Sequence, residues 1–587
     1  MDINKISPQL QLALRYEDLL SREAKVLFQM PNDPNRWQII VTYAGDLTQA
    51  IEELNMDVIK VGSKYLMAII PKENIGTLST SEQIIGLSLP VEQSYIDIGL
   101  GSVCASNIGL PTSQFNVTGK GVLVAIIDTG INYSYVDFLN EDNTTRIRYI
   151  WDQTIEGKIP VGFRRGAEYT QEQINEALQA ENREAQLEIV PSEDDSGHGT
   201  AMASIAAGNG RASNGANKGV APESELIIVK IGNYELGSSR PTDMDVMEGI
   251  DYVLGKAREL NMPISIILGI GNSLTGHDGY TPLEGYIEEI SYVWVCNVTV
   301  GAGNEANKGC HVSGQFKEGV TETIQFVMQG DKRSYGCCLW KEFIDEAEMV
   351  IQAPNGERTD PLSRRTPNRA YLFDNTAVLV NFLEPVSNIT RQEIFIWFQA
   401  QGTANINKGQ WNFSVTPKSV LIGNYNMWAQ ITESGSRFFN PSVEQTLTSP
   451  GTSRGGTTVG AFNAQTTQIA PFSGRGYTAD NRIKPDLVAP GINIPVANKD
   501  STTGYVNFTG TSAAAAFVGG AYALLLQYGL FVLQQRNFYG QRLRVYLVRT
   551  ATRASSYAPY PNESWGYGVL CIEAALSYML DLANTST

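Results

Sequence analysis

Three widely spaced side chains of this sequence are of the residue types that nucleophilic catalysis needs. Asp128 ends an apolar run in I-I-D-T-G-I, His198 lies in D-D-S-G-H-G-T, and Ser512 follows G-T in F-T-G-T-S-A-A. A serine hydroxyl attacks a carbonyl only when a neighbouring base takes its proton, and that base needs a carboxylate to hold its tautomer. The chain therefore offers a carboxylate, a base and a nucleophile, in that order.

Each of the three also has a simpler interpretation when it is taken alone. Ser512 suits the N-cap of a buried helix equally well, because Ala513–Ala516 are strong helix formers and an apolar run follows them. Asp128 is a candidate cap for the turn after its strand, and His198 is a candidate surface or capping residue. The combination of the three, rather than any one of them, favours catalysis.

A fourth polar group fits the same reaction. In V-G-A-G-N a strand pattern runs into a glycine turn and ends at Asn304. An asparagine amide there can donate a hydrogen bond to the oxyanion of a tetrahedral intermediate. Ser512 is then the nucleophile, His198 the base, Asp128 the group that orients the base, and Asn304 a stabiliser of the oxyanion.

The other histidines and two nearby acidic residues are expected to have no catalytic task. His277, in T-G-H-D-G, is interpreted as a loop histidine, and His311 as a structural one. Asp194 and Asp195 precede His198 and are expected to be surface carboxylates, either of which can influence the pKa of that histidine.

A parallel α/β sheet is predicted to position these groups. Continuous apolar, β-branched runs are typical of strands buried on both faces, and helical segments such as Thr242–Leu260 separate several of them. The predicted strands are Val122–Ile127, Leu226–Lys230, Ile264–Leu268, Val293–Val300 and Thr457–Ala461. Functional groups gather at the carboxyl edge of such a sheet, where Asp128 is placed.

Other regions have different patterns. Residues 1–95 predict a small α+β unit with the order β-α-β-β-α-β. Residues 140–194 are polar and are expected to form a surface insertion with one helix at Thr170–Gln186. Alternating runs from Val312 to about Ile431 predict an inserted antiparallel β-sandwich. We therefore divide the chain at residues 1–95, 96–311, 312–435 and 436–587, with the sandwich third and the α/β domain in two parts around it.

Composition excludes several classes of function. The 44 basic and 61 acidic residues give a net charge of −17, which argues against nucleic acid as a partner. No segment has the length and purity of a membrane span, and the N-terminus lacks the pattern of a secretory signal peptide. Six cysteines are too few for a disulfide framework. No cofactor is expected; acidic loops such as 140–142 offer oxygen ligands for a structural Ca²⁺, but none has the spacing of a calcium loop.

The four motifs together resemble the signature set of the subtilisin-like serine proteases (peptidase family S8). Gly219–Pro222 (G-V-A-P) and Lys484–Gly491 (K-P-D-L-V-A-P-G) are similar to further family segments. The resemblance implies a subtilisin-like doubly wound parallel sheet. Two departures are that Ala516 and Phe517 replace a Pro-His pair, and that A-M-A-S follows G-H-G-T; neither touches a catalytic group.

Within that family the sequence is similar to the Csp germination proteases of spore-forming Firmicutes. T-R-I-x-x-I-W-D-Q at Thr145–Gln153, the sandwich between Asn304 and Ser512, and Y-P-N-E-S-W-G-Y-G at Tyr560–Gly568 carry this resemblance. It implies that the inserted sandwich is a jelly roll and that residues 1–95 are a prodomain acting as an intramolecular chaperone and inhibitor. It also implies autoprocessing within residues 87–106, with Gln93–Ser94 the first choice.

The predicted function is therefore an endopeptidase that removes its own prodomain and activates a protein zymogen, such as a spore cortex hydrolase during germination. Its partners are a protein substrate and its own cleaved prodomain. An extended substrate is predicted to lie along Leu268, Gly269 and Ile270 on one side and along Ala302 and Gly303 on the other. Synthesis in the cytoplasm and packaging in the spore are expected.

Two alternatives remain open. One is a catalytically silent scaffold or germinant-signalling protein on the same fold. The other is a sandwich that binds a wall carbohydrate, although the sequence shows no stripe of exposed aromatic residues.

Overall fold

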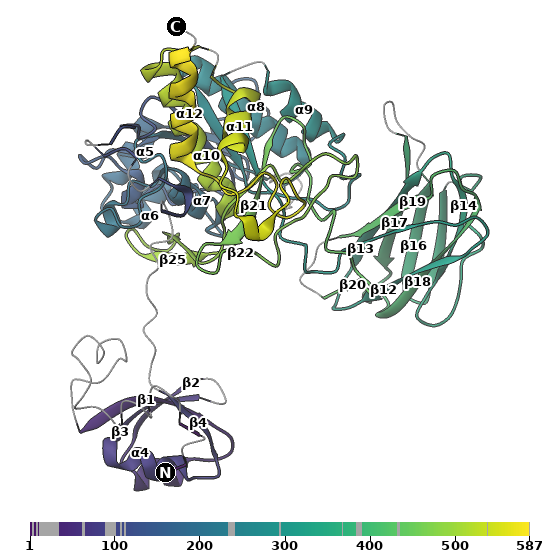
Figure 1. The fold of residues 1–587 in the computed structure, drawn as a ribbon, viewed down its shortest axis with the longest axis horizontal. Coiled ribbons are helices and arrows are strands. Elements are labelled where there is room, and N and C mark those ends of the chain that lie inside the picture. The colour runs from purple at the N-terminus through teal and green to yellow at the C-terminus, as the bar shows by residue number, and fades with distance from the viewer. Residues whose placement is uncertain are drawn as a thin grey trace. The chain divides into compact units, whose positions relative to one another are not determined.

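The computed structural model separates the chain into two compact units, residues 1–96 and 97–587, which are drawn in Figure 1. It describes residues 1–2, 5–6, 10, 14, 35–61, 65–88, 101–105, 108–110, 113–232, 241–292, 295–366, 368–382, 390–430, 435–536 and 538–585. The predicted autoprocessing residues Gln93 and Ser94 lie outside the described residues.

In its described residues, the first unit is an antiparallel four-stranded sheet with two short helices. Its elements are β1 (Arg36–Tyr43), α3 (Thr48–Glu53), β2 (Asp57–Val61), β3 (Tyr65–Pro71), α4 (Ile75–Ser79) and β4 (Ile84–Ser88). The strands lie in the order β2-β3-β1-β4. Trp37, Ile39 and Val41 alternate along β1 with no exposed area, so one face of the sheet forms the core of this unit.

A largely parallel sheet forms the centre of the second unit. Its strands are β5 (Leu123–Asp128), β6 (Ile147–Asp152), β7 (Ala167–Thr170), β8 (Glu225–Lys230), β9 (Ile264–Leu268), β10 (Cys296–Gly301), β21 (Thr457–Asn463), β22 (Gln468–Ile469) and β23 (Leu487–Pro490). They run β22-β21-β10-β9-β5-β8-β6-β7, with β23 beside β21. Because β5 pairs with β8 on one side and β9 on the other, the topological switch point lies at the end of β5.

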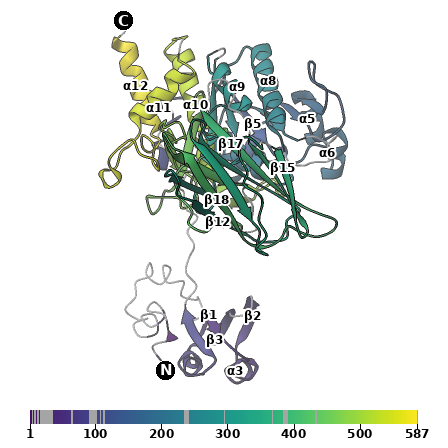
Figure 2. The same cartoon turned by 90° about the vertical axis from the view of Figure 1, so that its right-hand side faces the viewer.

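Helices cover both faces of this sheet. They are α7 (His198–Ala207), α8 (Asp243–Leu260), α9 (Pro282–Ile290), α10 (Thr511–Gln527), α11 (Gln541–Thr550) and α12 (Ile572–Thr585). A Cβ on Gly249 of α8 would touch Ile127, which pairs with Leu268 in the sheet. A Cβ on Gly519 of α10 would touch Ile267, the residue before Leu268. Since successive strand residues face opposite sides, α8 and α10 lie on opposite faces, as Figures 1 and 2 show.

The apolar α10 is the central helix of the second unit. With the turn that follows it, Thr511–Val532 is long and apolar enough to cross a membrane, and it is the single helix of that kind in the part of the chain that the structure describes. Nearly every α10 side chain is buried against the sheet and against α7. Its hydrophobicity is accounted for by this packing.

The segment 140–194 differs from the expectation of a surface insertion. It contributes β6 and β7 to the central sheet and carries two helices, α5 (Gln171–Leu178) and α6 (Arg183–Ile189), instead of one. Polar side chains within β6, such as Arg148 and Asp152, concealed the strand, which pairs with β7 and β8 inside the sheet.

The segment between β10 and β21 forms two antiparallel sheets. One has the order β11-β19-β13-β17-β16-β15 and the other β14-β18-β12-β20. Their strands are β11 (His311–Gln315), β12 (Glu322–Met328), β13 (Ser334–Glu342), β14 (Glu346–Gln352), β15 (Asn368–Phe373), β16 (Thr376–Phe382), β17 (Arg391–Ala400), β18 (Gly409–Ser419), β19 (Asn424–Ala429) and β20 (Arg437–Phe438). Side chains from both sheets fill one hydrophobic core. We call this two-sheet body the sandwich.

Candidate active site

The carboxylate and the imidazole of the predicted triad meet at the switch point of the sheet. Asp128 is the last residue of β5, and His198 is the first residue of α7. His198 Nδ1 lies 2.7 Å from Asp128 Oδ1, which also accepts a hydrogen bond from the Thr129 amide at 2.8 Å. The Asp128 side chain is 3% exposed and that of His198 is 29% exposed. This arrangement fixes the ring and leaves its other nitrogen for proton transfer.

Opposing influences act on the pKa of His198. Burial lowers this pKa, but the charge of Asp128, the hydrogen bond to it and the charge of Asp194 together raise it above its ordinary value. The ring also contacts Phe508 edge-on, with centroids 5.2 Å apart. The imidazolium that forms during proton transfer is therefore stabilised by two carboxylates.

Asp194 is a structural part of this site, and the expectation that it lies on the surface is wrong. It is 6% exposed, and its Oδ1 accepts hydrogen bonds from Thr129 Oγ1 and the Gly197 amide. Its Oδ2 accepts from the amide and hydroxyl of Thr200 in the first turn of α7. Asp195, by contrast, is exposed and pairs with Lys230 at 2.7 Å. Asp194 thus fixes the start of α7, where His198 lies.

The predicted nucleophile is the second residue of α10. Ser512 is 6% exposed, at the end of the helix where backbone amides point outward. In the part of the chain that the structure describes, its hydroxyl makes no hydrogen bond to His198. Catalytic hydrogen bonds of substrate-free enzymes are commonly long and shorten when substrate binds.

Asn304 and the Ser512 amide lie beside the same glycine, Gly510. Asn304 Oδ1 accepts a hydrogen bond from the Thr511 amide at 2.9 Å, which orients the planar amide group. A Cβ on Gly510 would lie 3.4 Å from Asn304 Nδ2 and 3.8 Å from the Ser512 nitrogen. Two hydrogen-bond donors therefore lie close to the serine, and donors of this kind stabilise an oxyanion.

The two predicted substrate-binding segments differ in their free hydrogen-bonding groups. The Ala302 amide donates to Val459 and its carbonyl accepts from Thr448, while the Gly303 amide donates to Thr511 Oγ1 and its carbonyl accepts from Gly474. These groups are therefore engaged within the fold.

The segment that follows β9 has groups left for a substrate. Leu268 is a fully buried end of β9, whereas the main chain of Gly269 and Ile270 makes no hydrogen bond within the described residues. A Cβ on Gly269 would lie 2.2 Å from Asp128 Oδ2 and 2.6 Å from His198 Cε1, so only glycine fits there. Gly269–Ile270 is the segment that can pair with an extended substrate.

Glu305 is a buried group near the site that the sequence interpretation missed. It is 7% exposed, and its Oε2 has no hydrogen-bond partner among the described residues. A Cβ on Gly303 would lie 2.4 Å from that oxygen. Burial raises the pKa of Glu305 to about 7, partly offset by Lys308. Its position directly after Asn304 was the available signal, but burial could not be read from it.

His277 and His311 are both buried against Trp428. His277 stacks on this indole with centroids 4.1 Å apart, and His311 does so at 5.0 Å. His277 lies in the loop after β9 and Trp428 lies in β19, so this stack joins the parallel sheet to the sandwich.

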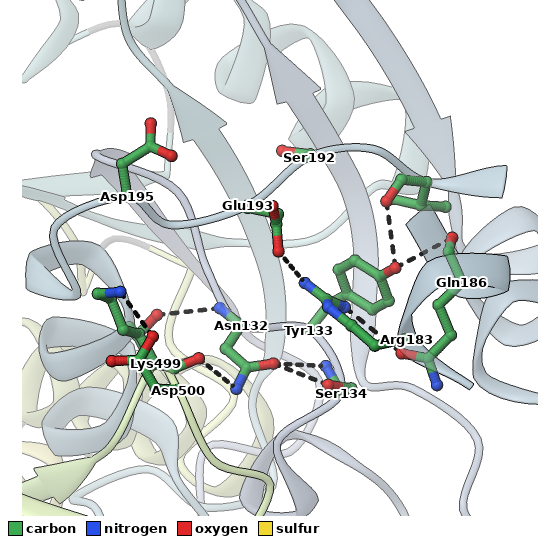
Figure 3. Close-up of polar contacts among 12 residues, drawn as sticks. Asn132, Tyr133, Ser134, Arg183, Gln186, Ser192, Glu193, Asp195, Lys499 and Asp500 are labelled. Atoms are coloured by element: carbon green, nitrogen blue, oxygen red, sulfur yellow. Dashed lines mark hydrogen bonds and ion pairs between the residues drawn. The ribbon is translucent and has the colours of Figure 1, made fainter. Parts of the chain in front are cut away.

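The segment that follows Asp128 is held by two distant parts of the chain, as Figure 3 shows. Tyr133 Oη donates to the carbonyls of Gln186 and Val190, and Arg183 lies over the Tyr133 ring. Asn132 Nδ2 donates to the carbonyls of Lys499 and Ser501. These contacts fix the turn at the end of β5, and so the position of Asp128.

No metal centre is found in the described ranges: no group of three or more His, Cys, Asp or Glu residues gathers there. In the acidic loop at 140–142, Asp142 instead accepts hydrogen bonds from the amide and hydroxyl of Thr144.

Comparison with known proteins agrees with this geometry. Residues 119–325 and 421–568 match the Subtilase family (peptidase S8), so the chain belongs to the subtilase family of serine proteases. Residues 4–91 match the Csp protease B prodomain. Within the family, then, this is a Csp-type chain.

Individual relatives support the same placement. The CspB protease of Clostridium perfringens has 30% identity and a TM-score of 0.74, covering 83% of this chain and 97% of that one. Serine protease AprX of Bacillus subtilis is 32% identical over 195 residues, 32% of this chain and 34% of AprX. A protein of Aquifex aeolicus is 36% identical over 130 residues, 17% of this chain and 59% of its own length. The chain thus spans well under two thirds of these two curated relatives.

Proposed function

We propose that the chain is a serine endopeptidase in which Ser512 attacks the scissile carbonyl. His198 takes the serine proton and passes it to the leaving amine, while Asp128 orients the ring. Asn304 Nδ2 and the Ser512 amide stabilise the oxyanion. The single observation that supports this most is the nearness of these two donors to a serine at the start of α10.

The first substrate is the segment of the chain that follows the prodomain. We infer cleavage within residues 87–106, with Gln93–Ser94 as first choice, and retention of the released prodomain as an inhibitor. Mass spectrometry of purified protein tests this: the wild type is expected as two fragments, and Ser512→Ala as one intact chain. Two fragments from the Ser512→Ala protein would mean that another protease acts or that Ser512 is not the nucleophile.

The physiological role that fits a Csp-type chain is limited proteolysis of a zymogen. We propose a spore cortex hydrolase as that zymogen, and we propose that the enzyme is made in the cytoplasm and packaged in the spore. The two sheets of the sandwich are proposed to form a jelly roll. Incubation of the processed enzyme with a purified cortex hydrolase precursor checks the substrate: one new N-terminus is expected, and none with Ser512→Ala.

The alternative is a silent scaffold on the same fold. Because residues for every catalytic role are present, this alternative requires that they fail to reach their catalytic geometry when a substrate binds. A fluorophosphonate probe distinguishes the two, because it labels a serine only when its hydroxyl is activated. Labelling at Ser512 is expected.

A further inference from the structure

One outer face of the sandwich carries an apolar surface that no catalytic step uses. On the six-stranded sheet, Ile394, Ile396 and Phe398 of β17 point into the core, so the intervening side chains of Phe395 and Trp397 point outward. Both are half-buried, and their rings stack with centroids 6.1 Å apart.

Strand register extends this surface across the sheet. Trp397 pairs with Gly336 of β13 on one side and with Leu379 of β16 on the other. Leu379 pairs with Ala370 of β15, and Leu372 lies two residues along that strand. Leu379 is 43% and Leu372 is 65% exposed. Figure 1 shows β13, β17 and β16 side by side, and at about 4.8 Å per strand the row extends roughly 14 Å.

The row begins at a loop of the candidate active site. A Cβ on Gly336 would lie 2.7 Å from Leu274 Cδ1 and 3.2 Å from Trp397 Cε3, so Leu274 and Trp397 meet over this glycine. Leu274 lies only five residues after Gly269, and Gly269 touches His198. The apolar row therefore begins in the same loop that carries Gly269–Ile270, the segment that can pair with an extended substrate. We call the surface formed by Leu274, Trp397, Leu379 and Leu372 the apolar track.

The junction between the loop and the sandwich is tightly bonded. Ser273 Oγ donates to the Ala429 carbonyl of β19 at 3.0 Å. Arg391 of β17 donates to the Gly276 carbonyl at 2.6 Å and forms an ion pair with Asp278. Together with the stacking of His277 on Trp428, these contacts hold the apolar track in one orientation relative to His198.

The chemistry of the apolar track favours a polypeptide as its ligand. Its most exposed members, Leu372 and Leu379, are aliphatic, and the cross-strand partners of Leu379 are Ala370 and Trp397, whereas a sugar ring needs aromatic faces. An extended chain presents a side chain to one face about every 6.6 Å, a spacing that suits a flat row of this length. The position beside Gly269–Ile270 argues for a segment of the substrate itself.

We propose that the apolar track is an exosite, which binds an extended apolar segment of the protein substrate outside the residues held in the catalytic cleft. This inference rests on the proposed function and adds a second recognition site to it. Exosite binding raises the rate for protein substrates and leaves short peptides unaffected, because a short peptide cannot reach from Gly269 to Leu372.

Kinetics on two probes test the proposal. The probes are reduced and alkylated α-lactalbumin, which is unfolded, and a fluorogenic pentapeptide. The variants are Trp397→Ala and the double variant Leu372→Ser/Leu379→Ser; the control is Leu421→Ser, which replaces a 70% exposed leucine in the turn after β18. For both track variants, kcat/KM on α-lactalbumin is expected to fall at least fivefold while kcat/KM on the pentapeptide stays within twofold. The control changes neither.

An equal loss of kcat/KM on both probes would show that the substitutions disturb the fold instead of an exosite. No loss of kcat/KM on either probe would overturn the proposal. If the chain cleaves neither probe, the proposed function fails, and binding decides the exosite separately. Fluorescein-labelled α-lactalbumin is titrated with the Ser512→Ala chain, and the Leu372→Ser/Leu379→Ser changes are expected to weaken its anisotropy-measured binding. Retention on peptidoglycan that depends on Trp397, with unchanged α-lactalbumin binding, would replace the exosite by a carbohydrate site.

Discussion

At the scale of single residues, two carboxylates act on one imidazole in different ways. Asp128 accepts the ring hydrogen bond, whereas Asp194 holds the first turn of α7 and acts on the ring only through its charge. Burial opposes both, because it disfavours the imidazolium. The basicity of His198 is thus set by these charges against the apolar surroundings.

The pH dependence of the reaction follows from this balance. His198 must be neutral to accept the serine proton, and its pKa is raised, so kcat/KM is expected to increase with pH through a value above 6.5. Asp128→Asn removes the main stabilising charge, so this limb moves to lower pH and kcat falls by about 10⁴. Fluorogenic peptide kinetics between pH 5 and 9 measure both effects. If the rise of kcat/KM with pH occurs at the same pH in Asp128→Asn, a group other than His198 is responsible for it.

The oxyanion donor gives a second prediction at this scale. Asn304→Leu is expected to lower kcat by about 10²–10³ with little change in KM, since the donor acts in the transition state; this magnitude is the one measured in subtilisin. Asn405→Leu, at an exposed position, is the control. Equal kcat values for Asn304→Leu and the wild type would remove Asn304 from the mechanism.

At the scale of elements, the junction between the parallel sheet and the sandwich depends on neutral, buried aromatic groups. His311 has no exposed area, its Nε2 lies 2.9 Å from Asn426 Oδ1, and its ring stacks on Trp428. Burial lowers the pKa of His311 to about 4. The unfolded chain, with an ordinary pKa near 6.5, binds this proton more readily than the folded one.

Stability is therefore expected to fall as pH decreases from about 6.5 to about 4, and to be fully present above that window. His311→Phe keeps a ring against Trp428 and removes the titrating group, so its unfolding free energy should depend less on pH. Urea unfolding followed by near-ultraviolet circular dichroism at several pH values measures the difference. Parallel pH profiles for the two proteins would contradict this role for His311.

Some elements of the fold and the site could be predicted from the sequence, and others could not. The apolar runs of β5, β8 and β9 predicted the sheet, and the motifs of Asp128 and His198 predicted two side chains that meet at its carboxyl edge. The strand β6 was missed because polar side chains such as Arg148 interrupt its apolar pattern. Asp194 was misjudged because hydrogen bonding to a distant turn cannot be read from D-D. The apolar track was invisible because it depends on register between strands that lie far apart in sequence.

At the scale of the whole molecule, a small unit precedes a large one whose strands pair across long separations. Thr299 of β10, for example, pairs with Thr457 of β21, and the hydrogen bond between Thr511 and Asn304 spans 207 residues. Such non-local topologies fold slowly. Refolded residues 97–587 are therefore expected to regain activity much faster when residues 1–96 are added in trans. Residues 1–96 carrying Ile39→Asp, which places a charge in a fully buried position, should give no acceleration.

The position of the sandwich between Asn304 and Ser512 has a consequence for biosynthesis. The oxyanion donor leaves the ribosome before the sandwich does, and the nucleophile leaves after it. The serine can reach Asn304 only when the chain between them has collapsed into a body whose two ends lie close together. A chain that ends before Ser512 is therefore expected to be inactive, and proteolytic activity is expected only after the sandwich has folded.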